Sequence, residues 1–330
     1  MLEHGGRLRA AAQRHGIALG DWLDLSTGIA PYGWPLPPVP ASAWTRLPEA
    51  DDGLEAAARD YYGAPALLPV AGSQSAIQAL PRLRGRSRVG VLAPAYAEHA
   101  AAWERAGHEL LQLDAEEMDR QVDGLDVLLL VNPNNPTGRR FAPAQLLAWH
   151  RRLAARGGWL LVDEAFIDCT PQHSLAAYCD RPGLIVLRSF GKFFGLAGIR
   201  LGFVLAEPAL LGRLDELLGP WTVSGPARAL ATALLPDRRG QGEQRRRLSA
   251  DGRRLAELLS ARGWPPSGGC ALFQWCSDPR AAALHEFLAA QGILTRLFQA
   301  PLSLRFGLPA DEPGWARLEQ ALHAFKEHSA

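Results

Sequence analysis

The sequence predicts an α/β protein that has a mainly parallel, seven-stranded sheet domain and a smaller α+β domain. Three observations support this fold class. Short apolar runs alternate with helical patterns from about residue 67 to residue 206. The 330 residues are 48% hydrophobic and 21% charged, which is enough apolar material for about two domains. After residue 236 the pattern changes to an arginine-rich stretch followed by mixed strands and helices. We expect a large domain at residues 45–236 and a small domain at residues 1–44 and 237–330.

The elements of the large domain follow from local patterns in chain order. Pro31–Pro40 is too rich in proline for a helix or a central strand, so it predicts an extended N-terminal arm. Seven runs rich in valine, isoleucine and leucine predict the strands of the sheet. They cover residues 68–71, 88–93, 108–113, 126–131, 159–163, 184–189 and 199–205. The clearest helix is Ala144–Arg156, with a proline before it and two glycines after it.

The small domain is predicted to begin with a helix over residues 238–262. Strands are expected at Cys270–Trp275, at ILTRLF and at LSLRF, and helices after Pro279 and from Pro313.

Composition excludes several classes of partner. The formal net charge is +1, so no overall field favours nucleic acid or a membrane surface. Eight arginines cluster within residues 238–262, so a protein that binds nucleic acid through this stretch is one alternative function. Acidic residues are interspersed there, which favours a solvated helix face. The four cysteines show no metal-ligand spacing, and no secretory signal or membrane-length apolar run is present. We expect a cytoplasmic protein without a metal that acts on a small molecule.

Lysine is scarce in this chain. Only Lys192 and Lys326 are lysines, whereas 33 residues are arginines. Arginine stays protonated in proteins, but a partly buried lysine can lose its proton and become a nucleophile. Lys192 lies among glycines and aromatic residues in RSFGKFFGLAG. A solvated loop lysine is the alternative, but this setting favours a functional amine.

Polar residues follow the predicted strands at their carboxyl ends, where ligands collect in open α/β sheets. They would supply an anion site, an amide donor, an aromatic plate and a buried carboxylate close to the amine of Lys192. The anion site comprises Gly72, Ser73, Gln74, Ser189 and Arg200, and the other parts are Asn135, Tyr96 and Asp163. A planar aldehyde cofactor that has a phosphate arm and a ring nitrogen needs each of these parts. The set predicts pyridoxal phosphate.

The motifs NPNNPTG, VDEAFID and RSFGKFFGLAGIRLGF resemble those of fold-type I pyridoxal-phosphate enzymes of the aminotransferase superfamily. The resemblance implies that Lys192 binds the cofactor covalently, Asp163 pairs with the ring nitrogen and Asn135 bonds the ring oxygen. It implies further that Tyr96 stacks on the ring and that the phosphate is held by Ser73, Gln74, Ser189 and Arg200.

Two groups of this superfamily are most similar, the histidinol-phosphate aminotransferases and the threonine-phosphate decarboxylases of cobalamin synthesis. His4-Gly5-Gly6, DLSTGIAPYG and VLRSFGKFFGLAGIRLGF resemble the decarboxylases more. Phe166 also stands where such aminotransferases usually carry a tyrosine. We therefore expect decarboxylation of L-threonine O-3-phosphate to (R)-1-amino-2-propanol O-2-phosphate. Transamination of histidinol phosphate or another amino acid is the alternative.

The resemblance also implies substrate contacts and a dimer. Arg296 and Arg305 would bind the carboxylate and phosphate of a phosphorylated amino acid. His4 and Gly5 are further candidates, although residues so near the first position can also fray. A homodimer is expected because the family's sites lie at subunit boundaries. Leu47 stands where relatives often have a tyrosine that reaches the neighbouring subunit, so a contact across the dimer is open.

Overall fold

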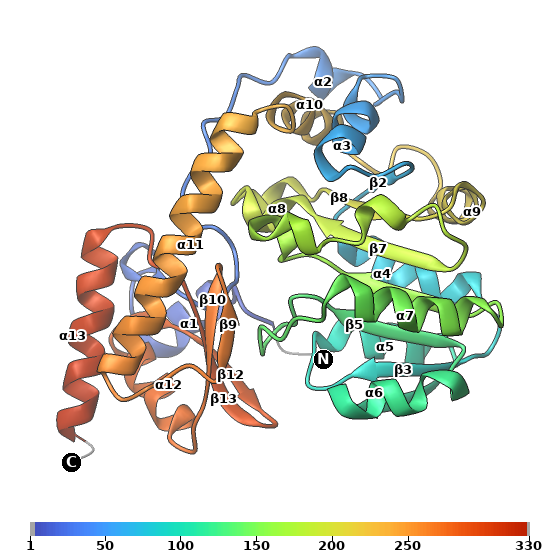
Figure 1. The fold of residues 1–330 in the computed structure, drawn as a ribbon. Helices are drawn as coiled ribbons and strands as arrows, with labels where there is room; N and C mark the ends of the chain where they lie inside the picture. The colour runs from blue at the N-terminus through green and yellow to red at the C-terminus, as the bar shows by residue number, and fades with distance from the viewer. Residues whose placement is uncertain (1–3, 329–330) are drawn as a thin grey trace. The chain divides into compact units, whose positions relative to one another are not determined.

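A computed structural model describes residues 4–328 and divides the chain into two compact units. The smaller unit comprises the described residues up to Gly33, the segment Pro136–Arg139 and the residues from Gln244 onward. The larger unit comprises Trp34–Asn135 and Arg140–Glu243. Each unit has its own sheet (Figure 1).

The larger unit contains the predicted seven-stranded sheet, in the order β2-β8-β7-β6-β5-β3-β4. Six strands run in the same direction, whereas β8 pairs antiparallel with both of its neighbours. The strands are β2 (Leu68–Val70), β3 (Arg88–Leu92), β4 (Glu109–Leu113), β5 (Val127–Val131), β6 (Trp159–Asp163), β7 (Leu184–Ser189) and β8 (Gly202–Leu205). The predicted number of strands and the mainly parallel arrangement are confirmed.

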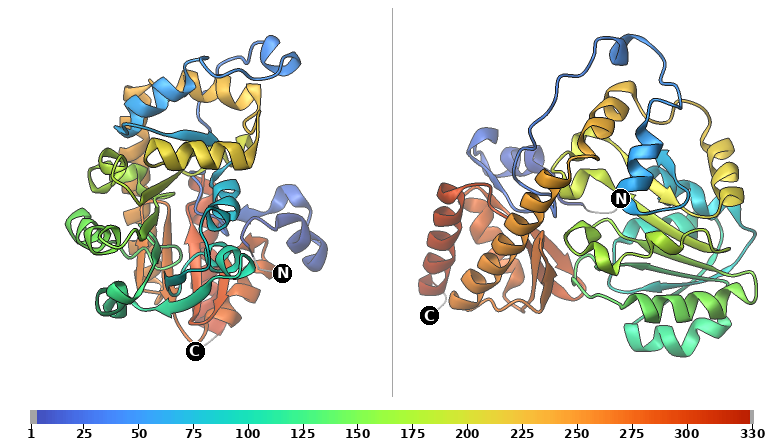
Figure 2. Two further views of the ribbon diagram at one scale, coloured as in Figure 1. Left: turned by 90° about the vertical axis from the view of Figure 1, so that its right-hand side faces the viewer. Right: turned by 45° about the horizontal axis from the view of Figure 1, so that its top comes forward.

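Helices cover both faces of this sheet, as the left view of Figure 2 shows. One face packs α4, α5 and α9 against alternate strand residues such as Val127, Leu129 and Leu161. The other face carries α6 and α7, with Leu146 and Trp149 buried. The helices of this unit are α2 (Ser42–Thr45), α3 (Leu54–Tyr62), α4 (Ser73–Ala79), α5 (Ala97–Arg105), α6 (Ala115–Gln121), α7 (Pro143–Ala154), α8 (Phe190–Phe193), α9 (Pro208–Leu218) and α10 (Gly225–Leu234).

The smaller unit has a four-stranded antiparallel sheet in the order β12-β13-β10-β9 and a parallel pair, β1 with β11. Its strands are β1 (Leu23–Asp24), β9 (Gly268–Cys270), β10 (Phe273–Ser277), β11 (Ile293–Leu294), β12 (Arg296–Gln299) and β13 (Leu302–Gly307). Its helices are α1 (Leu8–His15), α12 (Ala281–Ala290) and α13 (Glu312–His328). The long helix α11 (Arg238–Ala261) contributes residues to both units.

Two strand predictions need correction. The expected single strand Cys270–Trp275 is the hairpin of β9 and β10, with a turn at residues 271–272. The expected strand from residue 199 begins only at Gly202, because residues 197–199 form a 3₁₀ turn and Arg200 has a φ of 56°. Periodicity alone could not show either turn, since both lie inside apolar runs.

Several arginines in α11 or directly after it have acidic partners. Arg239, Arg247, Arg254 and Arg262 pair with Glu243, Asp251, Glu312 and Glu319 respectively. This charge pattern supports the solvated-face interpretation over nucleic-acid binding. No helix within residues 4–328 is long and apolar enough to cross a membrane.

Candidate active site

The ends of the central strands bring the predicted cofactor residues of the larger unit together. Asp163 is the last residue of β6 and pairs in register with Val131 at the end of β5. Ser189 ends β7 and pairs with Gly202, which also pairs with Val70 near the end of β2. These residues therefore share one edge of the sheet, where open α/β sheets bind ligands.

Gly72, Ser73, Arg200 and Gly202 form a close-packed cradle at this edge. Gly72 has a φ of 72°, and a Cβ there would lie 2.4 Å from Arg200 Nη2. A Cβ on Gly202 would lie 2.6 Å from the backbone nitrogen of Ser73. Because neither glycine has a side chain, space remains beside the Arg200 guanidinium group and the first backbone amide of α4. This arrangement suits a phosphate group.

Asp163 is buried, and each of its carboxylate oxygens has a partner. Oδ1 accepts a hydrogen bond from the Ala165 N–H at 3.0 Å, and Oδ2 lies 2.9 Å from His99 Nε2. His99 is 1% exposed, and its Nδ1 has no hydrogen-bond partner among the described residues. Sequence reasoning missed this histidine. Its position three residues after Tyr96, on the same face of the helix that follows, is the signal that could have indicated it.

Tyr96 lies beside this pair and bonds Gln74. The Tyr96 hydroxyl donates to Gln74 Oε1 at 3.1 Å, and the rings of Tyr96 and His99 are 6.1 Å apart and nearly perpendicular. Burial raises the pKa of Tyr96 to about 12, so its phenol stays protonated at neutral pH. Gln74 Nε2 donates to Glu98 at 3.0 Å. Because this side chain is engaged by Tyr96 and Glu98, we assign only the backbone amide of Gln74 to the cradle.

The NPNNPTG turn is fixed by two of its own asparagines. The Asn132 amide bonds the backbone of Phe141 with both its oxygen and its nitrogen, at 2.9 and 3.3 Å. Asn134 Nδ2 donates to the carbonyl of Pro94 at 2.8 Å. These bonds define the backbone on which the half-buried Asn135 stands.

Lys192 lies in the short helix α8 and is half-buried. Its Nζ is 5.6 Å from the centroid of the Phe166 ring. Phe166 is itself buried, three residues after Asp163. An apolar ring therefore lies close to the candidate amine, and this ring cannot donate a hydrogen bond.

A buried ionic network supports the ends of β6 and β7. Arg188 Nη1 lies 3.2 Å from Glu164, and Nη2 lies 2.6 Å from Asp168. Arg188 and Glu164 are adjacent in sequence to Ser189 and Asp163, with side chains on the opposite face because strand residues alternate. Burial raises the pKa of Glu164, although the Arg188 guanidinium opposes this effect.

The predicted substrate residues of the smaller unit also converge. Arg296 and Arg305 are directly opposite each other on β12 and β13. Arg305 is buried, and its Nη2 donates to the Ser26 carbonyl at 2.8 Å. The Gly6 N–H donates to Ser26 Oγ at 2.7 Å, and a Cβ on Gly5 would meet the Ser26 carbonyl oxygen. The N-terminal segment and Arg305 thus share one buried serine, while His4 is exposed.

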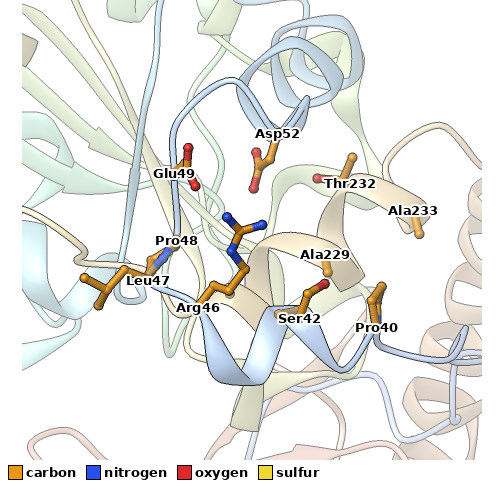
Figure 3. A pocket seen from close by; sticks show the side chains of 12 residues that line it. Pro40, Ser42, Arg46, Leu47, Pro48, Glu49, Asp52, Ala229, Thr232 and Ala233 are labelled. Atoms are coloured by element: carbon orange, nitrogen blue, oxygen red, sulfur yellow. The ribbon is translucent and has the colours of Figure 1, made fainter.

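A cavity of about 450 Å³ lies elsewhere in the larger unit (Figure 3). Its lining includes Pro40, Arg46, Glu49, Asp52, Ala229 and Thr232. None of the residues lining it is a predicted cofactor residue. Large apolar side chains are exposed close by in sequence, since Trp44 is 69% exposed and Leu47 is 63% exposed.

Known proteins resemble this chain in sequence and in fold. A family model described as Aminotransferase class I and II matches residues 41–324. The chain is 67% identical to a threonine-phosphate decarboxylase of Pseudomonas aeruginosa over 99% of both chains. It is 47% identical to a threonine-phosphate decarboxylase of Sinorhizobium sp. over 97% of both chains. Its fold matches that of a histidinol-phosphate aminotransferase from Sinorhizobium meliloti solved with pyridoxal-5'-phosphate. That match has a TM-score of 0.86 at 21% identity and covers 100% of this chain and 96% of the other.

Proposed function

Since the chain belongs to the class I and II aminotransferase family, we propose that it is a pyridoxal-phosphate-dependent decarboxylase of L-threonine O-3-phosphate. The product would be (R)-1-amino-2-propanol O-2-phosphate, a cobalamin precursor. The observation that carries the substrate is the 67% identity to a decarboxylase over 99% of both chains. The paired Arg296 and Arg305 suit a substrate that has two anionic groups.

The residues at the sheet edge fit the cofactor. Pyridoxal phosphate supplies an aldehyde that captures amines and a ring that accepts the electrons of the breaking bond. Lys192 would hold the aldehyde carbon, and the cradle around Gly72 and Arg200 would hold the phosphate. Asp163 would keep a proton on the ring nitrogen, while Asn135 and Tyr96 would orient the ring.

The substrate residues decide which bond breaks. The angle at which they hold the substrate carboxylate would select either loss of carbon dioxide or transamination. Arg305 is fixed by its bond to Ser26 and would hold one substrate anion at a set angle.

The decisive experiment supplies the holoenzyme with L-threonine O-3-phosphate and measures carbon dioxide and aminopropanol phosphate. We expect both products in equal amounts without any oxo-acid. A second reaction supplies histidinol phosphate and 2-oxoglutarate and follows the cofactor absorbance. Conversion to the amine form without release of carbon dioxide would replace this proposal with an aminotransferase.

A homodimer is also part of the proposal. The exposed Trp44 and Leu47 lie on the segment that borders the cavity of Figure 3, and two large apolar side chains exposed so close in sequence would suit a protein partner. In sedimentation equilibrium, the wild type should have the mass of a dimer, and the Trp44→Asp variant should have a mass closer to that of the monomer. An unchanged dimer would place the interface elsewhere, and a monomeric wild type would refute the dimer. Cys169, Cys179, Cys270 and Cys276 form no disulfide in the described part of the chain, which fits the reducing cytoplasm; this location remains a prediction.

A further inference from the structure

Trp275 lies in the same row of the small sheet as the two predicted substrate arginines. It is directly opposite Arg305 in the pairing of β10 with β13, and Arg305 is directly opposite Arg296 in the pairing of β13 with β12. Residues that face each other across antiparallel strands have their side chains on the same face, with Cβ atoms about 5 Å apart. The indole and both guanidinium groups therefore share one face.

Residues in or directly after α11 hydrogen-bond to side chains on the opposite face of this sheet. Gln274, which alternates with Trp275, donates to the carbonyl of Gly252 in α11 at 2.9 Å. Cys276 Sγ lies 3.3 Å from the carbonyl of Trp264, just after α11. The face of Trp275 and the arginines is thus the one turned away from α11.

The indole N–H of Trp275 lacks an acceptor. Trp275 is 9% exposed, and its Nε1 has no hydrogen-bond partner among the described residues. An indole nitrogen can only donate, and leaving a buried donor unbonded costs free energy. Gly268, opposite Trp275 on β9, has no side chain, and a Cβ there would collide with the carbonyl of Thr137. The neighbouring strand therefore offers no side-chain acceptor.

The electrostatics of this face favour an anion. Burial lowers the pKa of Arg305 to about 10, and repulsion from Arg296 adds to this effect. Two cations held side by side are stabilised by a negative partner. The oxygens of a carboxylate or phosphate could accept from a guanidinium and from an indole N–H at the same time.

We infer that Trp275 is a specificity-determining residue whose Nε1–H donates to the substrate oxyanion that Arg305 binds. The inference rests on the proposed function for the identity of that substrate. The indole adds one directional hydrogen bond to the charge of the arginines.

The kinetic test replaces Trp275 by Phe, which keeps an aromatic ring and removes the N–H. We expect KM for threonine phosphate to rise about tenfold, which corresponds to about 1.4 kcal/mol, with kcat within about twofold. Trp22→Phe is the matched control, because Trp22 is also 9% exposed but its N–H already donates to the Ile17 carbonyl at 3.3 Å. An unchanged KM in W275F would overturn the inference.

The spectroscopic test follows the indole signals of the ¹⁵N-tryptophan-labelled holoenzyme, with W275F identifying the Trp275 resonance. W275Y serves the same purpose if W275F does not fold. We expect the resonance to move with inorganic phosphate, acetate or threonine phosphate. A Trp275 signal that stays fixed with all three at saturation would refute the inference. If the wild type forms no carbon dioxide but phosphate or acetate moves the signal, the proposed function fails while Trp275 remains an oxyanion donor.

Discussion

At the scale of single residues, the contact between His99 and Asp163 is the main feature that the sequence did not reveal. Asp163 could be predicted, because a carboxylate directly after an apolar strand is costly unless it meets a cation. Its histidine partner comes from another element, 64 positions earlier. Such a contact depends on how α5 packs beside β6. Local patterns in the sequence carry no information about this packing.

Replacement of His99 by Phe should lower kcat about tenfold to a hundredfold. The change leaves Asp163 Oδ2 without its buried partner, and an unsatisfied buried acceptor costs about 1–3 kcal/mol. His108→Phe is the control, because His108 is also buried but bonds Ser87 and Pro81. Steady-state kinetics on both variants should show the kcat effect in His99→Phe alone. Equal kcat in His99→Phe and the wild type would contradict a role for His99 in positioning Asp163.

At the scale of elements, the cradle between α4 and β8 depends on glycine. Replacement of Gly202 by Ala should raise the dissociation constant of pyridoxal phosphate at least about tenfold. The new Cβ would lie 2.6 Å from Ser73 N and 2.8 Å from the Arg188 carbonyl, closer than real contacts. Absorbance titration of the apoenzyme measures this affinity.

The control for this change is Gly198→Ala, where a Cβ would meet nothing within 4 Å. Its affinity for the cofactor should equal that of the wild type. Tight binding by Gly202→Ala would show that the phosphate lies elsewhere.

The network of Arg188, Glu164 and Asp168 stabilises the ends of β6 and β7. Arg188→Met should lower the free energy of unfolding by about 3–5 kcal/mol, since it leaves two buried carboxylates without their cation. Arg14→Met removes an exposed pair with Glu286 and should cost less than about 1 kcal/mol. Urea denaturation followed by circular dichroism compares them. Similar decreases in the free energy of unfolding in both variants would mean that the buried network contributes little to stability.

Sequence patterns predicted some of the secondary-structure elements better than others. Most of the seven strands were predictable because buried parallel strands are continuous apolar runs. The start of β8 at Gly202 was not, because it depends on the left-handed backbone of Arg200, which an apolar pattern does not indicate. The alignment of Trp275 with Arg305 was also hidden, since register depends on the turns between the strands.

At the scale of the whole molecule, cofactor binding should contribute to stability. Removal of pyridoxal phosphate should lower Tm by about 5 °C, because a ligand that binds only the folded state stabilises it. Differential scanning fluorimetry with and without the cofactor measures the shift. Lys192→Ala should show a smaller shift because it loses the covalent attachment. An apoenzyme as stable as the holoenzyme would argue against binding at this site.

The scarcity of amines has a practical consequence. Lys326 is exposed on α13, whereas Lys192 is half-buried beside Phe166. Few other primary amines exist in the chain, so an acylating mass tag would find almost no competing targets. Acylation of Lys192, read by peptide mass spectrometry, would therefore report the fraction of empty enzyme in a crude extract, without purification or an enzymatic assay.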